Sequence, residues 1–226
     1  MRCEDGVRTA CDAPLPLPPA LRVRIRDFND THPDFELPPS EIHTEEPEFG
    51  ILAPELGSDD LPVFVGPAWS IESAATFGQW YRDTQGVNLP QDMELPLIVH
   101  PLQEGLYIYK DEAFFPIDNQ LFGNQGRPHN YHFTLEARAT FTYVGGEVFR
   151  FHGDDDFWIF INRKLAIDLG GLHPPRAGEI LLDEAAERLG LEPGRVFALD
   201  LFFAERHTIS SNFTIETTLN DIGPCP

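Results

Sequence analysis

The sequence predicts a mainly β protein, an antiparallel β-sandwich with short helical insertions, and three observations lead to this prediction. Apolar and polar residues alternate strictly from Tyr131 to Tyr143, which is typical of a strand with one buried face. Further short apolar segments, separated by turn residues, follow in the second half of the chain. The 18 Gly and 21 Pro residues favour many turns over long helices.

Charge and composition exclude several classes of protein. The 226 residues include 37 Asp and Glu against 16 Lys and Arg, so the formal charge is −21 at pH 7. A nucleic-acid-binding face is not expected, since Lys and Arg supply most of that affinity, and an anionic membrane surface would repel the chain. No apolar run approaches the ~20 residues that span a bilayer, and the first residues lack the apolar segment of a signal peptide. The 42% hydrophobic content is enough for a sizeable core.

The chain is expected to begin with a Pro-rich tether at 1–20, because the four Pro among residues 12–20 favour an extended spacer. The domain is predicted to span 21–222, and residues 223–226 are expected to form a C-terminal tail. The first strand is predicted at 21–26, where Leu, Val and Ile alternate with three Arg.

Residues 29–62 are predicted to form a long, irregular excursion rich in Pro and acidic residues. From Asp27 to Tyr81 there is no Lys or Arg, yet there are a dozen Asp and Glu. We interpret this stretch as a solvated face, with cation binding or adaptation to a salty exterior as the alternatives. A short strand is expected at 62–65.

A helix is predicted from Ser70, as its N-cap, to about Arg82. Its aromatic residues, Phe77, Trp80 and Tyr81, are interpreted as core rather than as a platform for a ligand. A second, short helix is predicted at 183–189 and ends before Gly190. The remaining strands are predicted at 148–151, 157–161, 165–169, 196–203 and 213–219.

The three cysteines, Cys3, Cys11 and Cys225, lie near the ends of the chain. This placement favours staples in an oxidising compartment over a catalytic thiol, and the spacing fits no zinc motif. Cys3–Cys11 and Cys11–Cys225 are both plausible disulfides, and each leaves one thiol over. We predict the Cys11–Cys225 pair, since the termini of a domain often lie close together.

Three adjacent carboxylates, those of Asp154, Asp155 and Asp156, lie between two apolar strands. Adjacent anions repel one another, so they must face water, pair with Arg or bind a cation. A hard cation such as Ca²⁺ takes ~6–8 oxygen ligands, and one short loop can supply several of them. An exposed acidic turn is the alternative that composition leaves open.

The segment Gly153–Asn162, followed by Leu165–His173, resembles the fibro-slime domain, a relative of the PA14 β-sandwich. The resemblance extends over roughly residues 21–220, and the combination of motifs is specific, although Gly-Asp-Asp alone would not be. The further matching motifs lie at 26–28, 77–83, 86–88, 114–118, 129–131, 202–207 and 211–213.

The resemblance implies a PA14-like antiparallel β-sandwich in a secreted or surface-attached protein. Many PA14 domains bind carbohydrate, and in the lectin members two Asp joined by a cis peptide bond hold a Ca²⁺ that contacts sugar hydroxyls. Asp154 and Asp155 match this pair, and Asp156 stands where many PA14 domains have Gly, so the pair could shift to Asp155–Asp156. A late loop adds an Asn in those lectins, and Asn212 is the only Asn of the corresponding loop here. The implied metal site is therefore Asp154, Asp155, Asp156 and Asn212.

Four further residues are kept as candidate ligand-binding residues: Asp118, Asp168, His173 and His207. Asp118 lies in one of the matching motifs, and His207 begins the late loop. For Asp168, a cap on the turn backbone is favoured over a metal ligand. For His173, which precedes two Pro, a turn residue is favoured over a ligand.

No catalytic arrangement is predicted, because glycosidases need two carboxylates ~5–10 Å apart across a cleft and adjacent Asp residues do not provide them. Motifs of serine hydrolases, phosphate-binding loops and zinc proteases are absent from the sequence. We predict an extracellular, Ca²⁺-dependent carbohydrate-binding or adhesion module, secreted or at the cell surface, whose partner is a glycan or a cell-surface or matrix component. The alternative is a non-catalytic structural domain of a surface fibre or extracellular matrix protein, in which any bound ion is purely structural.

Overall fold

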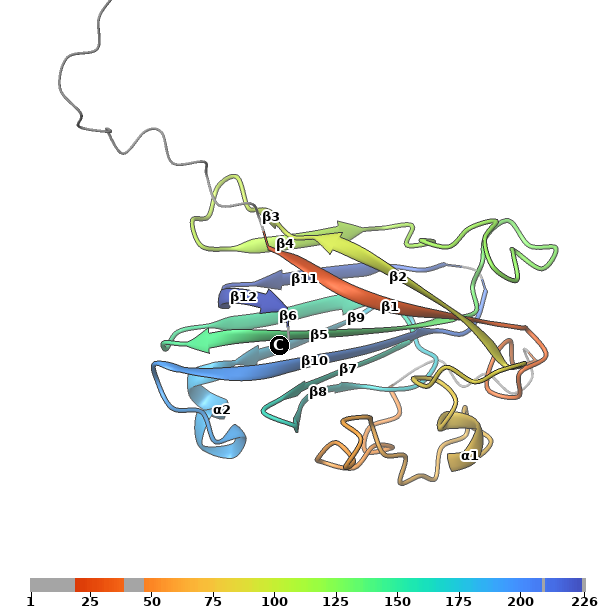
Figure 1. Cartoon of the computed structure of the whole chain (residues 1–226), viewed down its shortest axis with the longest axis horizontal. Helices are drawn as coiled ribbons and strands as arrows, with labels where there is room; N and C mark the ends of the chain where they lie inside the picture. The colour runs from red at the N-terminus through yellow and green to blue at the C-terminus, as the bar shows by residue number, and fades with distance from the viewer. Residues whose placement is uncertain (1–18, 39–46, 209, 225–226) are drawn as a thin grey trace, which may run out of the picture.

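The computed structural model describes residues 19–38, 47–208 and 210–224, which form two β-sheets packed against each other (Figure 1). Every strand pair in this part of the chain is antiparallel, which confirms the predicted fold class. The helices are α1 (Ala74–Phe77) and α2 (Leu182–Leu189). The strands are β1 (Ala20–Phe28), β2 (Asn88–Pro96), β3 (Ile98–Val99), β4 (Tyr107–Asp111), β5 (Phe133–Tyr143), β6 (Val148–Gly153), β7 (Asp156–Ile161), β8 (Lys164–Leu169), β9 (Arg176–Leu181), β10 (Arg195–Glu205), β11 (Phe213–Thr217) and β12 (Asn220–Pro224).

The larger sheet has the strand order β2-β1-β5-β10-β7-β8. Its central strands, β5 and β10, pair along their full length, so that Leu135 lies opposite Phe203 and Phe133 lies opposite Glu205. β12 pairs with the second half of β5, beyond the residues that pair with β1. The sheet therefore continues past residue 222, where the C-terminal tail was expected to begin.

The smaller sheet has the strand order β3-β4-β11-β6-β9, and its inner face packs on the larger sheet to enclose the main core. Aromatic rings from both sheets meet there, and the ring centroids of Phe203 and Phe213 are 5.1 Å apart. The Phe side chains at the centre of this core are at most 1% exposed; they are Phe133, Phe151, Phe157, Phe203 and Phe213.

The outer face of the larger sheet carries a second core. Trp158, Phe160 and Phe202 point away from the main core because side chains alternate along a strand. Apolar side chains from the described residues between 28 and 87 cover them, and Figure 1 shows this segment, in orange to gold, beside β7 and β8. Every residue of β7 is consequently buried.

The helix predicted from Ser70 to Arg82 is much shorter in the structure, so that prediction was wrong. α1 is a single turn capped by Ser73, whose hydroxyl accepts the Thr76 N–H at 3.1 Å. The chain leaves the helix at Gly78 and continues in turns, which bring the three aromatic rings of this segment into the second core. Those rings are at most 3% exposed, as the sequence analysis expected of core residues.

Strands with a polar or Pro-rich sequence were not predicted. β2 lies at the edge of the larger sheet and is held by backbone pairing to β1, which leaves little apolar alternation to detect. β9, an edge strand of the smaller sheet, and β4, which lies between β3 and β11, were also not predicted. The strand expected at 62–65 is reduced to an isolated bridge between Leu52 and Phe64.

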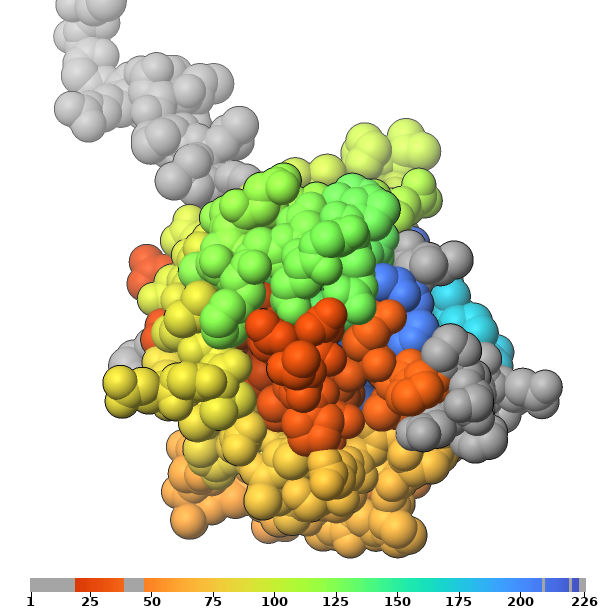
Figure 2. Space-filling view, turned by 90° about the vertical axis from the view of Figure 1, so that its right-hand side faces the viewer, coloured from red at the N-terminus to blue at the C-terminus, as the bar shows by residue number. Residues whose placement is uncertain are grey.

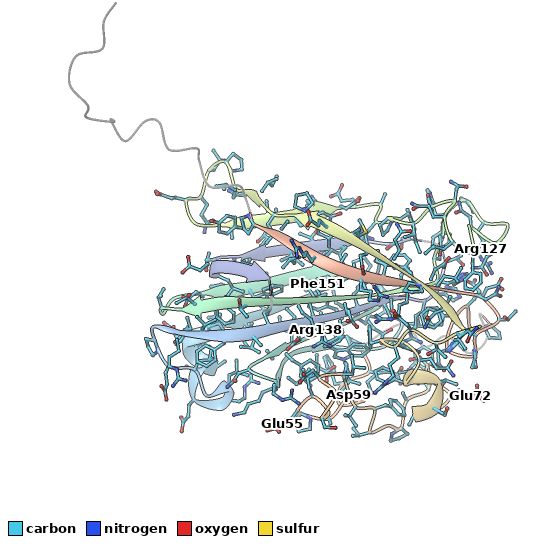
Figure 3. The ribbon with its side chains drawn as sticks, in the orientation of Figure 1. Glu55, Asp59, Glu72, Arg127, Arg138 and Phe151 are labelled. Carbon is cyan, nitrogen blue, oxygen red and sulfur yellow. The ribbon has the colours of Figure 1, made fainter. Side chains whose placement is uncertain are left out.

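The acidic stretch from Asp27 to Tyr81 is solvated only in part. Asp59 is exposed and pairs with Arg82, whereas Asp34 is wholly buried and accepts the Trp80 indole N–H at 2.9 Å. Figure 3 shows Asp59 and Glu55 together at the lower side of the molecule, within this excursion. Among the described residues, no helix has the length and apolar character needed to cross a membrane.

Candidate functional site

Loops from distant parts of the chain meet at one end of the sandwich, on the right in Figure 1. Figure 2 views the molecule from this end and shows segments around residues 30, 120 and 206, in red-orange, green and blue, side by side. The connection from β6 to β7 and the loop from β10 to β11 both lie here, and together they carry the acidic triplet and Asn212.

Asp154 and Asp155 link the two sheets, since β6 ends at Gly153 in the smaller sheet and β7 begins at Asp156 in the larger one. Asp155 has a φ of +56°, in the left-handed region that Asp enters more readily than most residues. A Cβ at Gly153 would lie 2.4 Å from the carbonyl oxygen of Asn212. Glycine is therefore required where the two loops pack together.

Asp154 ties this link to the loop between β10 and β11. Its carboxylate accepts hydrogen bonds from Ser210 Oγ at 2.9 Å, Asn212 Nδ2 at 3.0 Å and the Asn212 backbone N–H at 2.5 Å. The structure thus brings together Asp154 and Asn212. The Asp154–Asp155 peptide bond is trans, in contrast to the cis bond that the lectin resemblance implied; the cis bond of the described residues is Gly66–Pro67.

Asp156 belongs to a buried ion pair. Its Oδ2 lies 2.5 Å from Arg206 Nε, its Oδ1 accepts the Gly171 N–H at 2.6 Å, and both charged side chains are wholly buried. Arg206 also donates to the carbonyl oxygens of Asp34 and Ser70, at 3.0 and 2.7 Å, and to Ser70 Oγ at 3.1 Å. Since the Arg206 guanidinium balances the charge of Asp156, we assign Asp156 to the fold rather than to an ion site.

Arg206 also fastens the segment between β1 and β2 to the larger sheet. Its guanidinium carbon lies 4.7 Å from the centroid of the Trp80 ring, in a cation–π arrangement. Burial of the guanidinium is offset by the Asp156 charge, which helps to raise the pKa of Arg206. The sequence analysis did not identify this arginine as the partner of the triplet.

Glu205 lies at the end of β10, one residue before Arg206, and the sequence analysis assigned it no role. It is wholly buried, and its carboxyl group interacts with the side chains of Ser211 and Asp155. Burial, together with the charges of Asp155 and Asp154, raises the pKa of Glu205 well above its usual value. Ser211, whose hydroxyl acts on Glu205, is also buried.

Asp155 shares this environment. Its Oδ2 accepts the Arg206 backbone N–H at 2.9 Å, and 6% of the residue is exposed. Burial raises the pKa of Asp155 to about 7; the Arg206 charge lowers it, and the charges of Asp156 and Asp154 raise it. The buried carboxylates of Asp154 and Asp155 therefore both act on Glu205, and the Arg206 charge acts on Asp155.

Strand alternation sorts these residues. Asp156 lies two residues before Trp158, so it shares the outer face of the larger sheet with Trp158. Arg206 lies two residues after Ala204, which is on the same face. Glu205 follows the register of Phe203, which points into the main core. The alternation Leu201, Phe203, Glu205 was the signal in the sequence that could have revealed an inward-facing acid.

The donor set of Asp154, Asp155 and Glu205 fits a hard cation in its chemistry, since carboxylate oxygens are the ligands that Ca²⁺ prefers. Burial disfavours the anionic form of Glu205, so a cation there would have to displace its proton. Within the described ranges, no three His, Cys, Asp or Glu side chains already form a metal-binding group. Binding would thus require Asp154 to exchange hydrogen bonds from the β10–β11 loop for the ion.

The other candidate residues contact protein groups. Asp168 accepts hydrogen bonds from Trp158 Nε1 at 2.9 Å and from the Gly50 N–H at 2.8 Å, so it braces the second core. His173 is buried, and its Nδ1 lies 3.0 Å from the carbonyl oxygen of Pro174. Its own carbonyl oxygen lies 3.5 Å from the Asp155 backbone nitrogen, which places His173 beside the link.

Asp118 and His207 lie in separate clusters. Asp118 accepts the Asn130 N–H at 2.7 Å and contacts His129 Nδ1 at 2.6 Å. His207 Nε2 lies 3.2 Å from the carbonyl oxygen of Leu37, so its ring faces the segment that precedes residue 39. The predicted Cys11–Cys225 disulfide and most of the 1–20 tether lie outside the described residues.

Comparison with known proteins identifies relatives over most of the chain. A family model described as the PA14 domain matches residues 102–226. The chain is 41% identical to protein psiQ of Dictyostelium discoideum over 184 residues, which is 75% of this chain and 18% of that protein. It is 37% identical to protein psiC of the same organism over 205 residues, which is 84% of this chain and 38% of that protein. The chain thus matches less than half the length of these two curated relatives.

Solved structures show only a loose overall likeness. The PA14 sugar-binding domain from an RTX adhesin has a TM-score of 0.33 and 10% identity, over 51% of this chain and 71% of that one. The PA14 domain of the MpAFP antifreeze protein has a TM-score of 0.32 and 9% identity, over 50% of this chain and 65% of that one.

Proposed function

This chain belongs to the PA14 domain family, and we propose that it is an extracellular, Ca²⁺-dependent carbohydrate-binding or adhesion module without catalytic activity. PA14 domains occur in sugar-binding and adhesin proteins, which supports the coarser part of this proposal. The partner is a glycan or a cell-surface or matrix component, and the protein acts outside the cell, secreted or at its surface.

One observation carries the proposal: Asp154 joins the β6–β7 link to the β10–β11 loop. This contact brings Asn212 and the acidic link to the same end of the sandwich, although they are more than fifty residues apart in the sequence. Loops that a rigid sandwich holds together in this way are the usual location of a binding site.

The residues have separate roles in this proposal. Asp154 and Asp155 hold the cation, and Asn212 offers its amide oxygen, since its nitrogen is the atom that faces Asp154. Bound Ca²⁺ would supply positive charge and open coordination positions for the vicinal hydroxyls of a glycan. Ser210 is exposed beside Asp154, so the β10–β11 loop is the side from which a glycan would approach.

The burial of the carboxylates favours a second candidate function. Asp154 is 4% exposed and Asp155 is 6% exposed, so an ion between them would lie largely within the protein. In this alternative the ion only fixes the two loops, and the domain is a structural part of a surface fibre or extracellular matrix. A bound ion whose ligands all come from the protein would favour this function over glycan binding.

A glycan array tests the proposal. Wild-type protein is applied in millimolar Ca²⁺ and in chelator, and Asp154→Ala is applied in Ca²⁺. We expect a set of glycans that wild type binds only with Ca²⁺ and that Asp154→Ala does not bind. Binding that persists in chelator would contradict Ca²⁺ dependence, and an empty array from Ca²⁺-loaded protein would favour the structural function.

A further inference from the structure

We propose that Phe122 and Leu121 form an apolar glycan contact, which stacks on one face of a pyranose ring. Both residues lie in the segment 112–132, which connects β4 to β5. The contact rests on the carbohydrate binding proposed above and adds recognition of the apolar face of the sugar to that site.

Two large apolar residues that are adjacent in the chain face solvent in this segment. Leu121 is 40% exposed and Phe122 is 36% exposed. The aromatic residues near either end of the same segment, Phe114 and Tyr131, are by contrast at most 4% exposed. Since scattered exposed apolar residues are common on protein surfaces, exposure indicates a contact only together with a further observation.

The backbone supplies that observation, because Leu121 has a φ of +55°. This left-handed conformation is uncommon for residues other than Gly, and Leu lacks the short polar side chain that makes it tolerable for Asn or Asp. Strained residues of this kind are concentrated at binding sites, where the strain has a function. Leu121 is thus an unfavourable choice for the turn alone, and its exposed side chain is the feature that a ligand would use.

Polar groups at the end of β1 and just after it hold the loop in place. The wholly buried Asp27 accepts the Phe122 N–H at 2.7 Å. The Gln125 side chain accepts the Asp30 N–H at 2.8 Å and donates to the Phe28 carbonyl oxygen at 2.9 Å. A loop that is already ordered loses little conformational entropy when it binds, so its exposed apolar residues suit a ligand contact.

The same segment adjoins the β10–β11 loop, which carries Asn212. The Phe114 N–H donates to the Ser211 carbonyl oxygen at 3.0 Å, one residue before Asn212. Figure 2 shows the segment around residue 120, in green, next to the blue segment around residue 206 at this end of the molecule. A glycan that approaches from the β10–β11 loop would therefore have the segment 112–132 beside it.

The chemistry of the contact favours a sugar ring over a charged ligand. From Leu121 to Gly126 the loop carries no Asp, Glu, Lys or Arg, whereas the chain as a whole has a formal charge of −21. The C–H groups on one face of a pyranose carry partial positive charge, and the face of an aromatic ring carries partial negative charge. Ligand sites combine such apolar contacts with a few polar ones, which the ion and Asn212 would supply.

A glycan array in millimolar Ca²⁺ tests the role of Phe122. The variants are Phe122→Ala, Phe122→Trp, which keeps an aromatic face, and Phe122→Leu, which keeps apolar bulk without a ring. Phe49→Ala is the matched control, because Phe49 is 65% exposed on the segment between β1 and β2. We expect Phe122→Ala and Phe122→Leu to weaken glycan binding on the order of tenfold. Phe122→Trp and Phe49→Ala should stay within about threefold of wild type.

A substitution of Leu121 separates a ligand contact from a structural one. Asn adopts the left-handed conformation more readily than Leu, so Leu121→Asn should melt at or above the wild-type temperature. It should nevertheless bind the same glycans more weakly, because the apolar surface is lost. A merely structural Leu121 would give the opposite result, a lower melting temperature with unchanged glycan binding.

Calorimetric titration with Ca²⁺ separates the apolar contact from the ion site. Phe122→Ala should bind Ca²⁺ as wild type does, and a loss of Ca²⁺ binding would overturn the glycan contact by showing that the loop positions the ion. Unchanged glycan binding in Phe122→Ala or in Phe122→Leu would overturn ring stacking and leave the proposed function standing. An array on which wild type binds no glycan would overturn both.

Discussion

Asp156 and Asp154–Asp155 are neighbours in the sequence, yet their surroundings have opposite charge balance. Asp156 lies on the outer side of the larger sheet, where the Arg206 guanidinium and the Gly171 N–H occupy both of its oxygens. Asp154 and Asp155 lie in the link between the two sheets, where both act on the buried Glu205. The charge of Asp156 is thus balanced by Arg206, whereas negative charge is in excess around Asp154 and Asp155.

This difference shows that adjacency in sequence does not make one site. Asp156 begins β7, whereas Asp154 and Asp155 lie in the link before it, where Asp155 has a left-handed φ, so the three acids face different environments. The Asp156–Arg206 pair joins the segment between β1 and β2 to the larger sheet. Asp154 and Asp155 keep the capacity to bind a cation. The first predictions below therefore concern stability, and the last concerns ion binding.

The largest expected effect is the loss of the Arg206–Asp156 pair. We expect Arg206→Met to lower the free energy of unfolding by ~3–5 kcal/mol, because Asp156 would remain buried without its partner. The double variant Arg206→Met with Asp156→Leu should recover part of this loss, since it removes both charges. Chemical denaturation measures both variants, and a double variant that is no more stable than the single one would contradict a simple ion pair.

A smaller effect concerns Asp27, a wholly buried carboxylate whose hydrogen-bond donors are uncharged. It accepts the Phe122 N–H at 2.7 Å and the Asn130 Nδ2 at 2.9 Å, and burial raises the pKa of Asp27 to about 6. The folded state therefore binds this proton more tightly than the unfolded state, whose pKa is ~3.9. The stability that the proton contributes is present below about pH 4 and is lost as pH rises to about 6.

Asp27→Asn should remove that pH dependence. The variant loses one acceptor, which costs ~1 kcal/mol at low pH. Its deficit relative to wild type should shrink as pH rises from about 4 to about 6, because only wild type acquires a buried charge there. Unfolding free energies at several pH values measure the difference, and a deficit that stays constant over this window would show that Asp27 is ionised throughout.

Much of the fold was readable from the sequence where one face of a strand is apolar. The alternation over 131–143 predicted β5 closely, and the short apolar segments predicted β7, β8 and most of β10. β2 was not readable, because its pairing to β1 depends on backbone hydrogen bonds that polar residues and Pro do not signal. The short α1 was overpredicted, since Ser73 and Gly78 bound a single turn inside an apparently longer helical pattern.

The candidate site was readable only in part. The resemblance to the fibro-slime domain pointed to Asp154, Asp155 and Asn212, and the structure places Asp154 against Asn212. Arg206 and Glu205 lie about fifty residues from the triplet, and strand pairing rather than any local motif brings them there. The pairing of β10 with β7 decides that Arg206 reaches Asp156 and that Glu205 faces the main core. This pairing could not be predicted from the sequence.

Calorimetric titration of Ca²⁺ at fixed salt, with Asp154→Ala against Asp59→Ala, tests the central claim most directly. Asp59 is an exposed carboxylate of the acidic excursion, paired with Arg82, and Figure 3 shows it at the lower side of the molecule. Diffuse attraction between exposed charges is screened within about 8–10 Å, whereas direct coordination is not. The proposed site predicts that Asp154→Ala abolishes specific Ca²⁺ binding and that Asp59→Ala leaves it almost unchanged. Equal weakening by the two variants would show a nonspecific acidic surface and would contradict the site.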